Sequence, residues 1–179
     1  MNALLESEII EGRKYVMSPT NFFHYVACDN LSGVIKKFLG KDYRLVQDVC
    51  ILPESNTRIY PDIAIFRKPL NITENGSIKG VPVLVAEILS PSTRHKDTGI
   101  KLAMYEKYGV KEYWIADPYG KYIEVYKPDG GKFKKVGLYQ KFHEEDWSSM
   151  TGEEKEEHPQ TIKIDFLGAE VNVNEIFEA

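Results

Sequence analysis

Residues 81–89, VPVLVAEIL, form an almost continuous apolar run that is interrupted by a single charged residue, Glu87. A run of this length and composition is typical of a β-strand that is buried on both faces. An amphipathic helix is expected at about 97–108, ended by Gly109, and a second apolar strand follows at 111–116, KEYWIA. A helix between two buried strands is long enough to be a parallel crossover, so this segment predicts a sheet covered by helices.

The rest of the chain is expected to supply further strands and one more long helix. Residues 5–17 are interpreted as a helix end followed by a strand, and residues 20–39 as an amphipathic helix that Thr20 or Asn21 can cap. Further strands are predicted at 43–52, 58–66, 122–126 and 132–140, a final hairpin at 162–173, and exposed loops at 67–80 and 144–160. The fold class is therefore α/β or α+β, a mixed sheet flanked by helices, and residues 1–179 are expected to form a single domain.

The overall charge argues against a protein that holds nucleic acid through a broadly basic surface, because the formal net charge is -4 and the pI is about 5.6. It does not exclude an enzyme in which bound divalent cations supply positive charge locally. No apolar run reaches the roughly 18 residues that a membrane span needs, and the first residues lack the pattern of a signal peptide. Since Cys28 and Cys50 show no metal-binding spacing, the protein is expected in the reducing cytoplasm.

Two acidic residues interrupt segments that are otherwise apolar. Glu87 would be costly to bury alone, so it either pairs with an arginine or lysine at the end of its strand or binds a cation. Asp62, in RIYPDIAIF, shares a strand face with Tyr60 and Ala64 by alternation, although it could instead cap a turn. Carboxylates on two neighbouring strands are the oxygen ligands that a magnesium-type ion prefers, and the backbone carbonyl of Ile88 could be a third ligand.

A third charged element lies on the helix expected at 97–108. Asp97 and Lys101 are four residues apart and therefore share a face, which predicts either a solvated ion pair or a lysine that points toward Glu87. In the second arrangement, Asp62, Glu87 and Lys101 converge at one end of the sheet. The carboxylates could then bind one or two divalent cations that polarise a phosphodiester, while the lysine helps to orient or deprotonate a water molecule.

Four segments carry a family resemblance: MSPTNFFH (17–24), YPDIAIF (60–66), the long stretch from PVLVAEIL to YWIADP (82–118) and NEIF (174–177). They resemble the Uma-type family of restriction endonucleases, which is itself similar to the PD-(D/E)XK nuclease superfamily. The resemblance covers nearly the whole chain and implies a restriction-endonuclease-like fold.

The resemblance also assigns roles to individual residues. The Pro61-Asp62 step matches the PD of the superfamily motif and Glu87 matches its second acid, but Leu89 stands where the motif has lysine. Lys101 would therefore have to serve as a migrated lysine. The implied catalytic residues are Asp62, Glu87 and Lys101, the metal ligands are Asp62, Glu87 and Ile88, and the supporting residues are Asp97 and His24, of which His24 either touches substrate or packs.

The implied function is that of an endodeoxyribonuclease that hydrolyses DNA phosphodiester bonds with Mg²⁺, for which Mn²⁺ can substitute, and that forms a homodimer by family analogy. The alternative is a catalytically inactive nuclease-fold module that binds nucleic acid or a protein partner, which Leu89 and the acidic charge favour. A third alternative is hydrolysis of a small phosphate ester or nucleotide. The cluster of Arg94, His95 and Lys96 could contact a DNA backbone or could be a solvated helix start.

Overall fold

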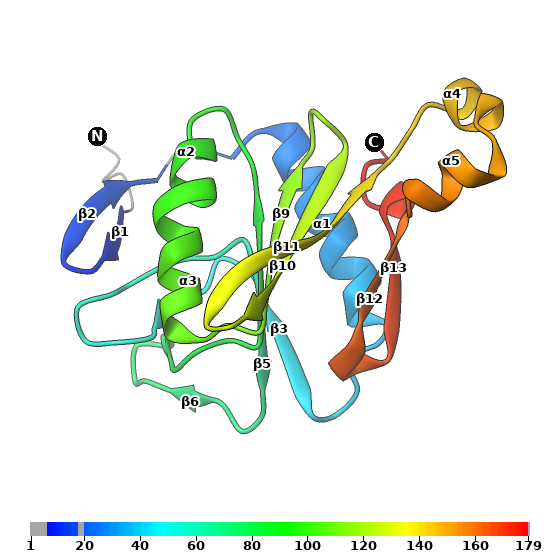
Figure 1. Ribbon diagram of the computed structural model, residues 1–179. Coiled ribbons are helices and arrows are strands. Elements are labelled where there is room, and N and C mark those ends of the chain that lie inside the picture. Colours follow the sequence, from blue (N-terminus) through cyan, green and yellow to red (C-terminus); the bar gives the residue numbers. More distant parts are fainter. Residues whose placement is uncertain (1–6, 18–19, 179) are drawn as a thin grey trace.

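Six strands form the central sheet of the computed structural model, which describes residues 7–17 and 20–178 (Figure 1). Their order across the sheet is β11-β10-β9-β8-β5-β3. The strands are β3 (Tyr43–Val46), β5 (Ile63–Arg67), β8 (Leu84–Ile88), β9 (Glu112–Asp117), β10 (Tyr122–Asp129) and β11 (Lys132–Gln140). Only β8 and β9 pair in parallel within this sheet as described, and the other neighbours are antiparallel. The predicted mixed sheet flanked by helices is confirmed.

Strands β8 and β9 are the buried centre of the sheet, and every residue in both is buried. The connection between them contains one helical segment over residues 94–108, which consists of α2 (Arg94–Lys96), a π-helical turn η1 (Asp97–Lys101) and α3 (Leu102–Tyr108). It ends at Gly109, which adopts the left-handed conformation with φ of 77°. The predicted helix and crossover are therefore confirmed, and the helix begins three residues earlier than expected.

Helix α1 (Phe22–Lys36) covers one face of the sheet and is shorter than the predicted segment 20–39. The side chain of Asn21 caps it by accepting a hydrogen bond from the backbone N–H of His24 at 3.1 Å. Ser18 and Pro19, which precede this cap, lie outside the described residues. In the part of the chain that the structure describes, no helix is long and apolar enough to cross a membrane.

The hairpin predicted at 162–173 is confirmed. It lies on the same side of the sheet as α1 (Figure 1). It consists of β12 (Thr161–Ile164) and β13 (Ala169–Asn172), with the short 3₁₀ turns η2 (Asp165–Leu167) and η3 (Val173–Glu175) after each strand.

The hydrophobic core has two layers, one on each face of the central sheet. Ala86 and Ile88 of β8 belong to the layer under α1 and the β12–β13 hairpin. Val85 and Leu89 belong to the layer under α3, which lies on the opposite face (Figure 1). Because neighbouring strand residues alternate between faces, Glu87 points toward α3.

The predicted helix end within 5–17 is wrong, because this segment forms a β-hairpin of β1 (Ser7–Ile10) and β2 (Arg13–Val16). The turn consists of Glu11 and Gly12, which both have positive φ values of 50° and 80°. Two such residues give the tight turn whose twist matches that of a hairpin.

The predictions at 43–52 and 67–80 also need correction. The first segment divides into β3 and β4 (Ile51–Leu52), because the chain turns at Asp48, whose φ is 51°. The second contains two short strands, β6 (Asn71–Ile72) and β7 (Ile78–Lys79), instead of an unbroken loop. Strand β7 lies between β4 and β6 in a separate small sheet.

The predicted loop at 144–160 is wrong as well, because it contains α4 (Glu144–Ser149) and α5 (Gly152–Glu157). Thr151 and Glu154 begin α5 with reciprocal hydrogen bonds between side chain and backbone, which satisfy the amide groups of its first turn. Both helices lie at the periphery, away from the central sheet (Figure 1).

Candidate active site

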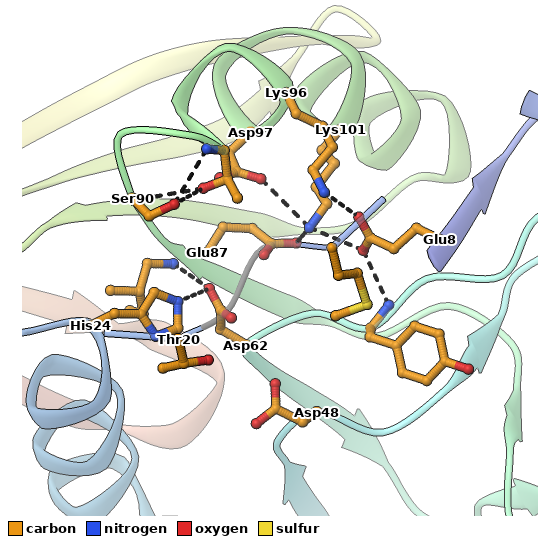
Figure 2. Close-up of a pocket in the computed structure, with 14 residues that line it drawn as sticks. Glu8, Thr20, His24, Asp48, Asp62, Glu87, Ser90, Lys96, Asp97 and Lys101 are labelled. Carbon is orange, nitrogen blue, oxygen red and sulfur yellow. Dashed lines mark hydrogen bonds and ion pairs between the residues drawn. The ribbon is translucent and has the colours of Figure 1, made fainter. Parts of the chain in front are cut away.

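Glu87 lies in β8, and Asp62 directly precedes the neighbouring antiparallel strand β5, at the rim of the central sheet. Ile63 pairs with Ala86, so continuing the register by one residue sets Asp62 opposite Glu87. Asp62 lies one residue before β5, not inside the strand as predicted. Both carboxylates line a cavity of about 60 Å³, which Figure 2 shows.

Asp62 joins the sheet to α1. Its Oδ2 accepts a hydrogen bond from the backbone N–H of Ile88 at 2.6 Å and lies 3.2 Å from Nε2 of His24 (Figure 2). Burial alone would lower the pKa of His24, but the hydrogen bond to Asp62 and the charge of that carboxylate together raise the pKa above its usual value. The Asp62 carboxylate therefore stabilises the charged form of His24.

Glu87 is almost fully buried, with 2% of its surface exposed, and contacts two groups from the helix above it. Its Oε1 accepts a hydrogen bond from the Tyr105 hydroxyl at 2.8 Å and lies 3.0 Å from Nζ of Lys101. Burial raises the pKa of Glu87 well above its usual value, and the charge of Lys101 offsets only part of this effect.

Lys101 is buried and contacts three carboxylates (Figure 2). Its Nζ lies 3.0 Å from Glu87, 3.1 Å from Glu8 and 3.5 Å from Asp97. Burial would lower the pKa of Lys101, but these carboxylates raise it well above its usual value, so the side chain stays charged. The solvated ion pair considered for Asp97 and Lys101 is therefore wrong, because both side chains are buried in the π-helical turn.

Glu8, which sequence reasoning missed, is the third acid that contacts Lys101. It comes from β1, is only 1% exposed, and its Oε2 lies 2.6 Å from Nζ of Lys96. Two signals could have found it: the Glu11-Gly12 pair predicts a hairpin turn, and strand alternation then sets Glu8 on the same face as the buried Ile10.

Acidic side chains outnumber basic ones in the lining of the cavity. Its ionisable lining consists of five acids, Glu8, Asp48, Asp62, Glu87 and Asp97, with two lysines, Lys96 and Lys101, and His24. A bound cation would compensate the surplus that remains after the lysines are paired.

Asp62 and Glu87 have the donor atoms that a hydrated magnesium ion needs. Within the described residues their contacts use only Oδ2 and Oε1, so one oxygen of each carboxylate is left for a ligand. Asp97 Oδ1 is also buried and accepts no hydrogen bond there, although it lies 3.5 Å from Lys101 Nζ. No group of three or more His, Cys, Asp or Glu side chains in the described ranges is arranged to hold a metal. Magnesium, however, binds through one or two carboxylates and keeps several waters, so the residues present fit this ion.

Leu89 explains why the lysine comes from the helix. Its side chain is 1% exposed and belongs to the hydrophobic layer that includes Met104 and Tyr105. A lysine at position 89 would have to leave this apolar layer to place its charge near Glu87, whereas Lys101 contacts Glu87 directly.

Two residues of the basic cluster predicted at the helix start form ion pairs with carboxylates of the protein. Arg94 pairs with Asp117, and Lys96 pairs with Glu8. Of the three residues proposed to contact a DNA backbone, two therefore already have carboxylate partners.

Comparison with known proteins identifies the family of the chain. The sequence model of a family named Uma2 and described as "Putative restriction endonuclease" matches residues 1–153. The chain belongs to the Uma2 family. The match includes every residue of the cavity described above, so the resemblance found in the sequence is confirmed.

A solved structure from Anabaena variabilis, described as a putative nuclease belonging to DUF820, is similar to this Uma2 chain with a TM-score of 0.72. The two chains are 18% identical, and the alignment covers 96% of this chain and 89% of the other. At this identity the likeness establishes the fold alone. A search of curated proteins gave no match.

Proposed function

We propose that the protein is a divalent-metal-dependent endonuclease that hydrolyses DNA phosphodiester bonds. The observation that carries the proposal is the approach of Lys101 Nζ to 3.0 Å from Glu87, in a cavity that Asp62 also lines from the neighbouring strand. Two carboxylates and an ammonium group within one small cavity are the set of groups that hydrolysis of a phosphate diester needs. Family membership supports the same reaction class.

Each residue would have a separate role. Asp62 and Glu87, with the backbone carbonyl of Ile88, would hold Mg²⁺ or its substitute Mn²⁺. When bound, the ion polarises the phosphodiester and makes water more acidic. Lys101 would orient the attacking water and offset the negative charge that develops on the phosphate oxygens. Asp97, 3.5 Å from Lys101, would support the position of that lysine.

The size of the cavity supports a polymeric substrate. A volume of about 60 Å³ holds a small hydrated ion or a few waters, whereas pockets that enclose a small molecule usually measure about 300 Å³ or more. A nucleotide would not fit inside, but one phosphate of a DNA strand could lie across the opening. We propose a homodimer by family analogy, and a cytoplasmic location because Cys28 and Cys50 are free thiols.

Cleavage of supercoiled plasmid and of single-stranded DNA, with Mn²⁺, with Mg²⁺ and with a chelator, tests the proposal. We expect Asp62→Asn, Glu87→Gln and Lys101→Met each to lower the cleavage rate by at least about 100-fold. Lys107→Met is the matched control, because Lys107 lies on the same helix and pairs with Glu11 on the surface. Cleavage that persists in the chelator, or that the three variants leave unchanged, would contradict the proposal.

The same assay tests the catalytically inactive module, which the apolar packing of Leu89 favours. Such a module would bind DNA without cutting it under any metal condition. Dependence on salt separates DNA from a small phosphate ester, because DNA affinity falls steeply as ions compete for the phosphates.

A further inference from the structure

We propose that Glu8 is a positioning residue for Lys101, through which the N-terminal hairpin takes part in the reaction. This inference rests on the proposed function. Glu8 comes from β1, far along the chain from the helix that carries Lys101, and yet its Oε1 lies 3.1 Å from Lys101 Nζ (Figure 2).

The hairpin holds Glu8 in place through backbone hydrogen bonds. The N–H and carbonyl groups of Ile9 bond those of Arg58 at 2.7 Å in both directions. The next residue, Ile10, is fully buried, and the N–H of Gly12 bonds the carbonyl of Asn56 at 2.9 Å. Glu8 is therefore fixed to the segment that leads directly into Asp62.

Both carboxylate oxygens of Glu8 are already used. Oε1 accepts the backbone N–H of Tyr60 at 3.2 Å in addition to contacting Lys101, and Oε2 contacts Lys96 at 2.6 Å. This carboxylate has no oxygen left over for a metal, unlike Asp62 and Glu87. Its effect on the reaction must therefore pass through the lysines it contacts.

The contacts of Lys101 show what Glu8 contributes. An ammonium group has three N–H groups, and three carboxylates, those of Glu87, Glu8 and Asp97, are its ion-pair partners. Asp97 is the most distant of the three, at 3.5 Å, and its Oδ1 accepts no hydrogen bond, so a water or phosphate oxygen can take its place beside the lysine nitrogen. Glu8 and Glu87 then hold the nitrogen from two sides while the third donor faces the substrate.

The first test compares Glu8→Gln with Glu11→Gln. Glu11 is the matched control, because it lies on the same hairpin and pairs with Lys107 of the same helical segment, outside the cavity. We expect Glu8→Gln to lower kcat by at least about tenfold with KM for DNA unchanged, since a misplaced group loses rate more than binding. Glu11→Gln should match the wild type.

The second test asks whether Glu8 acts through Lys101. In the Lys101→Met background, Glu8→Gln should cause no further loss of the residual single-turnover rate, because the group it positions is gone. An equal loss in both backgrounds, or a wild-type kcat for Glu8→Gln, would overturn the proposal. If Glu8→Gln folds poorly, Glu8→Gln with Lys96→Gln restores the charge balance and should show the same loss of kcat.

A third readout does not depend on activity. The nitrogen-15 signal of the Lys101 ammonium group is visible by NMR only while its protons exchange slowly with water. We expect the signal in the wild type and Glu11→Gln, and its loss in Glu8→Gln. A wild type without metal-dependent cleavage refutes the proposed function. An unchanged ammonium signal in Glu8→Gln refutes the positioning role.

Discussion

Lys101 is the residue on which the charge balance of the cavity depends most, because three buried carboxylates share its ammonium group. Burial raises the pKa of Glu87 and of Asp97, and the charge of Lys101 opposes this rise in both. Without the lysine, the folded state would have to hold these acids protonated or bear their repulsion.

We expect Lys101→Met to lower the free energy of unfolding by about 3 kcal/mol near pH 8, because it removes one partner from a buried set of charges. The carboxyl pKa values would rise further in the folded variant, so the folded state would bind protons that the unfolded state releases. Stability then falls as pH rises, and the deficit should shrink near pH 5. Urea unfolding at both pH values measures this, and Lys107→Met, an exposed lysine, should change stability by less than about 0.5 kcal/mol.

The affinity for Mn²⁺ should rise with pH. Burial raises the pKa of Glu87 well above its usual value, so protons compete with a cation for this carboxylate. We expect at least about tenfold tighter binding near pH 8 than near pH 6, measured by titration calorimetry. Asp62→Ala should bind no Mn²⁺ at either pH. An affinity that is independent of pH would show that Glu87 is not a ligand.

Some residues of the candidate site could be predicted from the sequence, and others could not. Asp62 and Glu87 stand out as acids in apolar strands, and the four-residue spacing of Asp97 and Lys101 sets both on one helix face. The signal for Glu8 is weaker, since the hairpin pattern puts it on the face of Ile10 but its partners are lysines far along the chain.

At the scale of elements, the π-helical turn η1 shapes the site, because both Asp97 and Lys101 lie within it and are buried. A π turn adds a residue to the helical repeat and changes the direction of the side chains that follow. Turns of this kind are frequent at functional sites.

Two glycines of this helical segment should respond to alanine in opposite ways. Gly99 lies in the π turn, and a Cβ there would meet no atom within 4 Å, so Gly99→Ala should stabilise the protein by about 0.5–1 kcal/mol. Gly109 has a φ of 77°, so Gly109→Ala should destabilise it by about 1–2 kcal/mol. Thermal unfolding of both variants measures the pair, and a loss of stability in Gly99→Ala would mean that the turn itself needs glycine.

The strand–helix–strand unit could be predicted because its apolar runs are long and its helix ends at Gly109. Two-residue strands such as β6 carry no periodic pattern, so only the tertiary structure defines them. Helix α5, which was predicted as part of a loop, could have been found from the sequence, because Thr151 and Glu154 have the spacing of a capping box.

At the scale of the whole molecule, a bound cation should stabilise the fold. Asp62 and Glu87 come together only when β5 and β8 pair, so an ion bound between them binds the folded state alone. We expect Mn²⁺ at about one hundred times its Kd to add about 2.7 kcal/mol to the free energy of unfolding. Thermal unfolding of the wild type measures the shift, and Asp62→Ala should show none. An equal shift in both proteins would place the ion elsewhere.

The packing of Leu89 in the core affects how relatives of this protein can be found. The Lys101 ammonium group reaches Glu87 from a separate helix, and the strand position that would hold a lysine is filled by the apolar side chain of Leu89. A genome search for an acid followed two residues later by lysine passes over such a chain. A three-dimensional template of two carboxylates and one ammonium group would retain it, whichever segment supplies the nitrogen.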